Sequence, residues 1–501
     1  MKPERSSSPF SMERALEEAL ARFRPLLSAE EWQALLEELK RPLAPALRLN
    51  PLKVNPAEVH MWAEWYGWRL QPVPFCPTGW QVVESAYPVS QTIEHRLGYY
   101  YIQDAASMLP VELFDFPPDA RPLILDMAAS PGGKTTHLVA RTNDRGLVIA
   151  NDSSHERLTA LRLVLQTWGG INLAITGFPG ERWGGWYPET FDAVLLDAPC
   201  SMQSLRPLES HPMRPISQGE QRRLAQRQVA LLLSGLRALR VGGQMVYATC
   251  TLAPEEDEAV LEAALQRHPG TFEIESVDDR LPAPAPALEA TPEHRFPPQV
   301  RRAVRLWPHR FHTAGFFAAR LRKVAPVPSE SGMTSPPQTR TRLTWLRPSE
   351  MREVLEALKR DYGLDMQPLF EVQVAGLVRR EDYLYAAPRA FEAYFGALPV
   401  VSLGLPLLEA TPEGWVLTHE GVARFGRQCQ HGRVILPAEM VTPWLRGEDV
   451  PLVIRPPWPK TRVVIVTDVH GRVLGRGRVQ RTQLKNLLPR RVVLQQPPSV
   501  P

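Results

Sequence analysis

The chain has few cysteines and no pattern that would link them. Its four cysteines, Cys76, Cys200, Cys250 and Cys429, lie scattered through 501 residues without a Cys-x-x-Cys spacing. Such sparse cysteines argue against a disulfide framework or a zinc cluster, and they favour a reducing compartment. Any cysteine with a special role is therefore expected to act as a free thiol, and we expect no metal.

Long apolar runs and a strong net charge are also lacking. The longest uncharged stretch, residues 393–408, is short for a membrane span and is broken by Pro399 and Pro406. Residues 1–17 contain no apolar segment of the secretory type. Because 58 basic residues face 54 acidic ones, the net charge is only +4, and a polyanionic partner would have to bind local patches. We expect a cytoplasmic protein with no membrane segment.

Proline, in contrast, is abundant, and it divides the chain. Its 51 residues are about twice the usual share. One Pro-rich tract, 281–299, is predicted to be a loop within a domain, and a second, 324–342, to be a linker. A chain of this length suits about three domains. We predict boundaries at 1–115, 116–323, 343–410 and 411–501, with the linker between the second and third segments.

The segment 116–323 has the pattern of an α/β fold with a doubly wound parallel sheet. Short buried apolar runs, at 123–127, 146–152, 173–177, 193–199, 242–250 and 315–321, alternate with helical patterns. The clearest helix is predicted over 217–240, where apolar residues recur at intervals of four and three. Before it, residues 13–40 have helical spacing and 46–54 read as a short strand, which together predict a small N-terminal α+β unit.

A turn rich in glycine follows the first strand of this segment. The strand ends at Asp126, and Ala128, Ala129, Ser130, Pro131, Gly132, Gly133 and Lys134 lead into a helix. Glycines let the backbone approach a ligand, and the helix N-terminus offers free N–H groups. The spacing is not that of a phosphate-binding P-loop. Taken alone, the turn is also explained as an ordinary tight turn that binds no ligand. Asp152 ends the next strand, where doubly wound folds bind ribose hydroxyls, so we predict an adenosyl-type ligand.

Two cysteines follow neighbouring strand ends. The fourth strand ends in Asp197-Ala198-Pro199-Cys200, and the fifth ends in Thr249-Cys250. A lone cysteine is usually a small buried hydrophobe. Two thiols that follow adjacent strand ends are harder to explain as buried hydrophobes, because both strand ends open into the same crevice. We expect both thiols and Asp197 to lie together beside the ligand.

Five motifs in order resemble one known family. DMAASPGGKT, LLDAPCS and YATCTLAPEEDEA, with YIQDAASMLPV upstream and RLWPHRFHTAGFF downstream, are similar to the motif series of the Sun/Nop family of RNA 5-methylcytosine methyltransferases, most of all its bacterial RsmF-like branch. The resemblance implies a Rossmann-like S-adenosylmethionine-dependent methyltransferase domain over 116–323 and an N-terminal RNA-binding extension over 1–115. It also implies an intermediate domain over 343–410 and a PUA-like RNA-binding domain over 411–501.

The resemblance also implies roles for single residues. Cys250 would add to C6 of cytosine so that C5 becomes nucleophilic, and Cys200 would remove the C5 proton afterwards. Asp197 would bind the cytosine edge and lie near the cofactor. Residues 128–134 and Asp152 would hold S-adenosylmethionine. A base that reacts has to leave its stack, which favours single-stranded or flipped RNA.

Some residues depart from the family pattern. Met202 stands where the family usually has glycine, and Arg206 is the only nearby cation where a basic pair is usual. After the third strand, residues 178–180 offer no acid for the adenine. His309 and His312 have no ligand set around them and are interpreted as structural.

The C-terminal segment 474–490 resembles the end of a PUA-like domain and is basic. We expect Arg476, Arg478, Arg481 and Lys485 to contact RNA phosphates, although an ordinary solvated strand face would look similar. An RNA cytosine-C5 methyltransferase acting on ribosomal RNA is the leading hypothesis. The alternatives are a non-catalytic RNA-binding assembly factor and the same chemistry on transfer RNA, and amine methylation ranks well below them. A monomer is expected.

Overall fold

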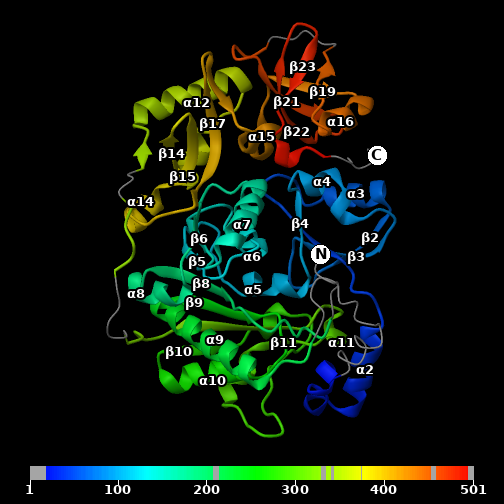
Figure 1. Cartoon of the computed structure of the whole chain (residues 1–501), viewed down its shortest axis with the longest axis vertical. Coiled ribbons are helices and arrows are strands. Elements are labelled where there is room, and N and C mark those ends of the chain that lie inside the picture. Colours follow the sequence, from blue (N-terminus) through cyan, green and yellow to red (C-terminus); the bar gives the residue numbers. More distant parts are fainter. Residues whose placement is uncertain are drawn as a thin grey trace, which may run out of the picture.

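The computed structural model describes residues 18–206, 214–328, 335–339, 343–373, 375–452 and 458–494. Figure 1 shows an elongated molecule with two C-terminal sheets at one end and helices α9 (Gln218–Ala238) and α10 (Glu258–Arg267) toward the other. Within these residues, no helix combines the length and the apolar character needed to cross a membrane. Parts of the predicted linker, 329–334 and 340–342, lie outside the described residues.

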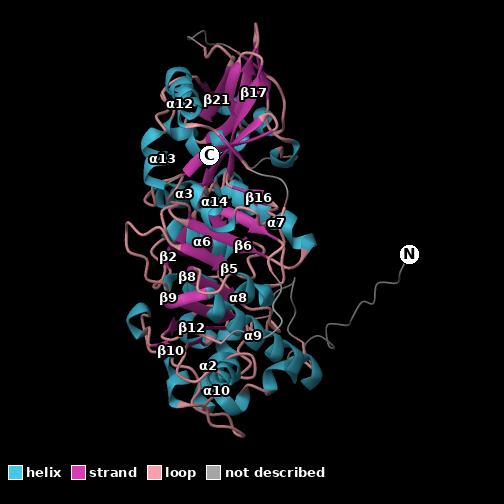
Figure 2. Cartoon of the chain, turned by 90° about the vertical axis from the view of Figure 1, so that its left-hand side faces the viewer, coloured by secondary structure: helices cyan, strands magenta, loops and turns pink. Residues whose placement is uncertain are grey.

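A long mixed sheet runs along the molecule, as Figure 2 shows. Its order is β10-β12-β9-β8-β5-β6-β7-β16, with β11 paired to β12. The strands from β9 to β7 are parallel to one another, whereas β10, β11, β12 and β16 run antiparallel to their partners. The strands are β5 (Leu123–Asp126), β6 (Leu147–Asn151), β7 (Leu173–Thr176), β8 (Phe191–Asp197), β9 (Leu239–Thr249), β10 (Phe272–Glu275), β11 (Val304–Leu306), β12 (Phe316–Lys323) and β16 (Ser402–Leu403).

Both faces of this sheet are buried, which explains why its strands are almost continuously apolar. Along β5, Ile124 packs into one hydrophobic core and Leu125 into another. Helices α5 (Leu109–Glu112), α6 (Gly133–Arg141) and α7 (His155–Trp168) belong to the first face, and α8 (Trp183–Trp186), α9 and α10 to the second. The Rossmann-like α/β fold predicted for 116–323 is therefore present.

The N-terminal region forms two separate parts. One part contains a four-stranded sheet with the order β2-β3-β1-β4, and the helices α3 (Glu58–Tyr66) and α4 (Ile93–Arg96) lie between its strands in the chain. The strands are β1 (Ala46–Leu49), β2 (Trp68–Pro72), β3 (Gly79–Ser85) and β4 (Tyr100–Ile102). The helix predicted over 13–40 is interrupted by a 3-10 turn at Arg24–Leu26, where Pro25 supplies no N–H, and resumes as α2 (Ala29–Leu39). Residues 18–39 pack against α11 (Pro308–Phe311) and share a core with Leu205 and Leu252.

The C-terminal half contains two five-stranded sheets. The first has the order β13-β14-β15-β17-β18 and the second β19-β21-β22-β23-β20. The predicted boundary after residue 410 falls inside β17, and β16 extends the central sheet through β7. The helices are α12 (Pro348–Tyr362), α13 (Gln367–Gln373), α14 (Arg389–Phe395), α15 (His419–Phe425) and α16 (Ala438–Leu445). The strands are β13 (Thr344–Trp345), β14 (Ala375–Arg380), β15 (Tyr383–Pro388), β17 (Leu405–Thr411), β18 (Gly414–Leu417), β19 (Arg433–Leu436), β20 (Val450–Pro451), β21 (Val463–Asp468), β22 (Val473–Val479) and β23 (Gln483–Asn486). The PUA-like identity of the last sheet stays a prediction.

Candidate active site

A cavity opens where the strand order of the central sheet reverses. Strand β5 pairs with β6 on one side and with β8 on the other, and such a switch point is where doubly wound sheets bind ligands. Asp126 ends β5 and Asp197 ends β8, so two carboxylates reach the same crevice. The cavity measures about 230 Å³ and is lined by residues 101–104, Ser107, Asp126, 128–131, Gly133, Lys134 and Asp197.

The loop from Ala128 to Lys134 forms one wall of this cavity and leads into α6. Gly132 has a φ of 115°, a conformation that side-chain-bearing residues rarely adopt. A Cβ on Gly133 would lie 2.8 Å from Cε1 of Tyr101, so that glycine lets the helix start pass close to the N-terminal region. Arg48 of β1 is fully buried and donates a hydrogen bond of 2.9 Å to the Gly133 carbonyl. The loop is thus held from two domains.

Asp152 lies behind this loop and not in the cavity lining. Its carboxylate accepts hydrogen bonds from the backbone N–H groups of Ser130, at 3.2 Å, and of Ser154, at 2.9 Å. Gly132 is also absent from the lining, whereas the other predicted residues of the loop face the cavity. In this structure Asp152 therefore shapes the loop, and its contact with a ribose stays a prediction.

The charges around the cavity favour a cationic ligand. Asp104, Asp126 and Asp197 face one ammonium group, Lys134, whose Nζ lies 2.7 Å from Asp197 Oδ2. Burial raises the pKa of Asp126 to about 7 and also raises the pKa of Asp104. Oδ1 of Asp126 is buried and has no hydrogen-bond partner in the described chain. Asp104 and Asp126 were not among the residues predicted to bind the cofactor, although Asp126 ends a predicted strand and Asp104 lies in the motif YIQDAASMLPV.

The two predicted cysteines meet beside this cavity. Cys200 Sγ lies 3.3 Å from Cys250 Sγ, and both are free thiols. The hydrogen bond to Cys250, together with burial, raises the pKa of Cys200 well above that of an ordinary thiol. Burial lowers the pKa of Lys134, but the charges of Asp197 and Cys250 outweigh this and the net shift is upward. Lys134 is thus a stable cation in this site.

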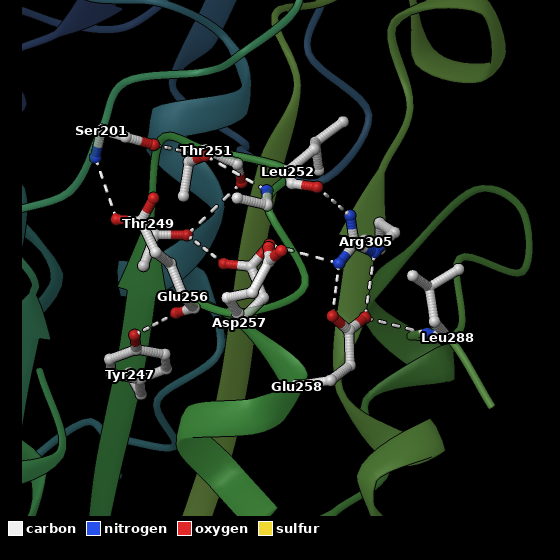
Figure 3. Close-up of polar contacts among 12 residues, drawn as sticks. Ser201, Tyr247, Thr249, Thr251, Leu252, Glu256, Asp257, Glu258, Leu288 and Arg305 are labelled. Carbon is white, nitrogen blue, oxygen red and sulfur yellow. Dashed lines mark hydrogen bonds and ion pairs between the residues drawn. The ribbon is translucent and has the colours of Figure 1, made fainter. Parts of the chain in front are cut away.

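A buried polar network lies behind the two thiols, and the sequence analysis did not single out its members. Figure 3 shows Glu256, Asp257 and Glu258, all fully buried, with Arg305 of β11 donating to both Asp257 and Glu258. Arg305 also donates to the carbonyl of Leu252, at 2.9 Å. The signal was present in the sequence as a run of acids after Cys250 and an arginine in the downstream motif, but neither showed that they pair.

The unusual loop after Cys200 has a defined conformation as far as Arg206. Met202 has a φ of 56°, and 46% of its surface is exposed. Arg206, expected as a nearby cation, is buried and paired with Glu38 of α2. It is therefore unavailable as a free cation near the thiols. Residues 207–213 lie outside the described part of the chain.

The four predicted RNA-binding cations divide into two groups. Arg478 and Lys485 are cross-strand partners on the β22–β23 hairpin, and Arg481 lies at its turn; all three are exposed and have no ion pair among the described residues. Arg476 instead lies 2.7 Å from Glu409 and donates to the Leu417 carbonyl, so it joins the two C-terminal sheets. We call Arg478, Arg481 and Lys485 the basic hairpin.

Comparisons with known proteins agree with this geometry. Residues 115–322 match the family model of the 16S rRNA methyltransferase RsmB/F, and residues 17–105 match that of the N-terminal domain of 16S rRNA methyltransferase RsmF. A ribosomal RNA small subunit methyltransferase F from Aeromonas hydrophila is 34% identical over 475 residues, which cover 93% of this chain and 94% of that protein. The protein of the same name from Erwinia tasmaniensis is 32% identical over 93% and 94% of the two chains.

The chain belongs to the RsmF family of ribosomal RNA small subunit methyltransferases. The predicted resemblance to the RsmF-like branch of the Sun/Nop family is thereby confirmed. A methyltransferase homologue from Pyrococcus horikoshii of known crystal structure is 31% identical, covers 64% of this chain and 100% of its own, and superposes with a TM-score of 0.54. The structure of NSun6 from the same organism, 20% identical with a TM-score of 0.51, supports the fold alone.

Proposed function

We propose that this chain is an S-adenosylmethionine-dependent methyltransferase that modifies C5 of a cytosine in the RNA of the small ribosomal subunit. Membership of the RsmF family supports the reaction class and the cofactor. The observation that carries the proposal is the pair of thiols 3.3 Å apart beside the cavity. Carbon C5 of cytosine is a poor nucleophile, and a thiol pair supplies both the activating addition and the later removal of a proton.

The cavity has the donor set that the cofactor requires. S-adenosylmethionine carries a sulfonium and an ammonium cation, and the unpartnered Oδ1 of Asp126 together with Asp104 offers them negative charge. Gly133 lets the start of α6 pack against Tyr101 in the cavity wall. We propose that Ala128, Ala129, Ser130, Pro131, Gly133 and Lys134 line the bound cofactor, with Gly132 and Asp152 fixing the loop. When bound, the cofactor supplies the methyl group as an electrophile.

The residues of this chain then divide the reaction between them. The Cys250 thiolate forms a bond to C6 and moves electron density toward C5. Asp197 faces the base edge near N3 and stabilises the adduct. After C5 has gained the methyl group, Cys200 takes the C5 proton as a thiolate, its own proton having been released to solvent. The C–H electron pair re-forms the C5–C6 double bond, and the C6–S bond breaks to return the Cys250 thiolate.

RNA binding is assigned to surfaces outside the cavity. The basic hairpin presents three cations without internal partners, and such groups bind phosphates without reading sequence. Arg476 is excluded from this proposal because Glu409 already pairs with it. The N-terminal sheet and the last C-terminal sheet are proposed to be the RNA-binding extension and the PUA-like domain. Ribosomal RNA as substrate places the enzyme in the cytoplasm.

The test is a methylation assay on defined RNA. Purified protein is incubated with methyl-labelled S-adenosylmethionine and small ribosomal subunits whose RNA lacks 5-methylcytosine, and the modified cytosines are mapped. Label on a defined cytosine, absent with Cys250→Ala, is the expected result. If transfer RNA and not the subunit RNA is labelled, transfer RNA replaces ribosomal RNA as the proposed substrate. Tight RNA binding with no label would instead favour the non-catalytic assembly factor.

A further inference from the structure

A single turn contacts both cysteine loops of the active site. Residues 256–258, drawn in Figure 3, lead into α10. All three are fully buried. Asp257 serves the loop of Cys250, because Thr249 Oγ1 donates to its Oδ1 at 2.6 Å. Glu256 serves the loop of Cys200, because the backbone N–H of Ser201 donates to its Oε2 at 2.9 Å.

The Cys200 loop is held on both sides of the thiol. Gln228 of α9 donates through Nε2 to Glu256 Oε2 and to the Pro199 carbonyl, each at 2.9 Å. Pro199 and Ser201 are the two neighbours of Cys200 in the chain, so Glu256 and Gln228 fix the backbone just before and just after the thiol. The hydroxyl of Tyr247 in turn donates to the Glu256 carbonyl at 2.5 Å and anchors the turn to β9. With its backbone fixed on both sides, Cys200 can move its thiol mainly by rotation of the side chain.

The Cys250 loop depends on other members of the turn. Besides the bond from Thr249 to Asp257, Arg305 binds Asp257 and the Leu252 carbonyl, both of which follow Cys250 in the sequence. The loops also contact each other directly. The hydroxyls of Ser201 and Thr251 form a hydrogen bond of 3.1 Å, and the Leu252 N–H donates to the Gln203 carbonyl at 3.0 Å, in addition to the contact between the two thiols. The turn therefore has separate attachments for the two thiols.

We infer that Glu256 is a positioning residue that, with Gln228, holds Cys200 where it can take the C5 proton, so that its loss blocks release of the RNA and not formation of the adduct. The inference rests on the proposed function and deepens it. Removing the carboxylate frees the Ser201 N–H and one side of Gln228. A displaced Cys200 leaves the C6–S bond in place because the proton on C5 is not removed.

The test follows the covalent complex between protein and RNA on a denaturing gel. Full-length protein is mixed with substrate RNA and S-adenosylmethionine, and the variants Cys200→Ala, Glu256→Ala and Gln228→Met are compared with the wild type. Because misplacement by about 1 Å can cost about 100-fold in rate, we expect Glu256→Ala to lower turnover roughly 100-fold. We also expect its complex to accumulate as it does in Cys200→Ala. Glu256→Gln keeps an acceptor oxygen and is expected to recover most of the turnover.

Thr249→Val is the matched control for the other loop. It removes one buried hydrogen bond of the same turn, but on the Cys250 side, and is expected to lower turnover without accumulating the complex. Cofactor affinity and the thermal unfolding midpoint check that each variant is folded, and Gln228→Met decides the question if Glu256→Ala does not fold.

The outcomes separate this inference from the function on which it rests. If Cys200→Ala accumulates the complex but Glu256→Ala and Gln228→Met do not, the positioning role is wrong and the proposed function stands. Accumulation with Thr249→Val to the same degree would also overturn the assignment of Glu256 to one thiol. If Cys200→Ala itself accumulates nothing, the proton-removing role of Cys200 fails, and the role of Glu256 fails with it.

Discussion

The candidate active site and the basic hairpin both concentrate charged side chains, but those of the site are paired with one another and those of the hairpin are exposed and unpaired in the described chain. Around the thiols, Lys134 is paired with Asp197, and Arg305 is fully buried between Asp257 and Glu258. On the hairpin, Arg478 and Lys485 point into solvent without an ion pair in the described chain. Bond formation at C5 and C6 needs groups held to within a fraction of an ångström, whereas phosphate contacts need only charge within reach.

The same contrast separates neighbouring residues within the C-terminal basic run. Arg472 is buried, with ion pairs to Asp468 at 2.5 Å and to Glu94 at 3.0 Å, and so ties the last sheet to α4 of the N-terminal region. Arg476 joins the two C-terminal sheets. A run that looks uniformly basic in sequence thus contains both structural cations and cations left for a partner.

The largest effect is expected at the nucleophile. Cys250→Ala removes the thiol that is proposed to add to C6, and we expect methylation to fall on the order of 1,000-fold or more. Mapping of methylated cytosines measures this. Cofactor affinity should not change. A Cys250→Ala variant that keeps its turnover would contradict the covalent mechanism, and with it the contrast between the active site and the basic hairpin.

A smaller effect is expected on the hairpin. Changing Arg478, Arg481 and Lys485 together to Gln should lower the slope of log affinity against log salt by about 2 to 3 and weaken RNA binding roughly tenfold, with cofactor affinity unchanged. The matched control neutralises Arg347, Lys359 and Arg360 of α12, which are exposed but already paired with acids. Equal losses in the two triple variants would show that the hairpin is an ordinary solvated face.

A pH effect of about the same size or smaller is expected in the cavity. The pKa of Asp126 is raised by burial to about 7, so the folded apoprotein loses stability as pH rises from the ordinary carboxyl range toward 7, where this group ionises while its Oδ1 has no hydrogen-bond partner among the described residues. A cationic cofactor favours the ionised form. Its affinity is therefore expected to rise roughly tenfold from pH 5.5 to pH 7.5, as measured by calorimetry. Asp126→Asn should bind more weakly and show a flat profile; an equally steep profile in this variant would assign the dependence to another group.

The smallest effect is expected at Met202. A non-glycine residue at a φ of 56° is strained, and Met202→Gly should raise the free energy of unfolding by up to about 1 kcal/mol, seen as a higher thermal midpoint. Met202→Ala keeps the strained backbone and serves as the control. If both variants shift equally, the exposed side chain and not the backbone is responsible.

Much of the fold and part of the site were accessible from the sequence. Six strands of the central sheet, β5 to β9 and β12, and helix α9 were predicted close to their observed bounds, because buried strands and a long one-sided helix leave strong periodic patterns. Strands β10, β11 and β16 were not predicted. The loop at 128–134 and the two thiols were found because they stand at strand ends. Helix 13–40 was predicted without its interruption at Pro25. The sequence also did not show that the neighbouring strands β16 and β17 belong to different sheets.

The sequence by itself determined which chemistry is available: two cysteines after adjacent strands, an acid at each of three strand ends and a glycine turn before a helix. Local patterns decide these features, because hydrophobic periodicity and backbone preference act over a few residues. Only the tertiary structure decided which polar groups meet. The pairing of Arg305 with Asp257 and Glu258, the clamp of Glu256 on the Cys200 loop, the burial of Arg472 and the ion pair of Arg476 with Glu409 depend on contacts between segments tens to hundreds of residues apart. Burying a charge is costly unless it is paired, and the partners come from these distant segments.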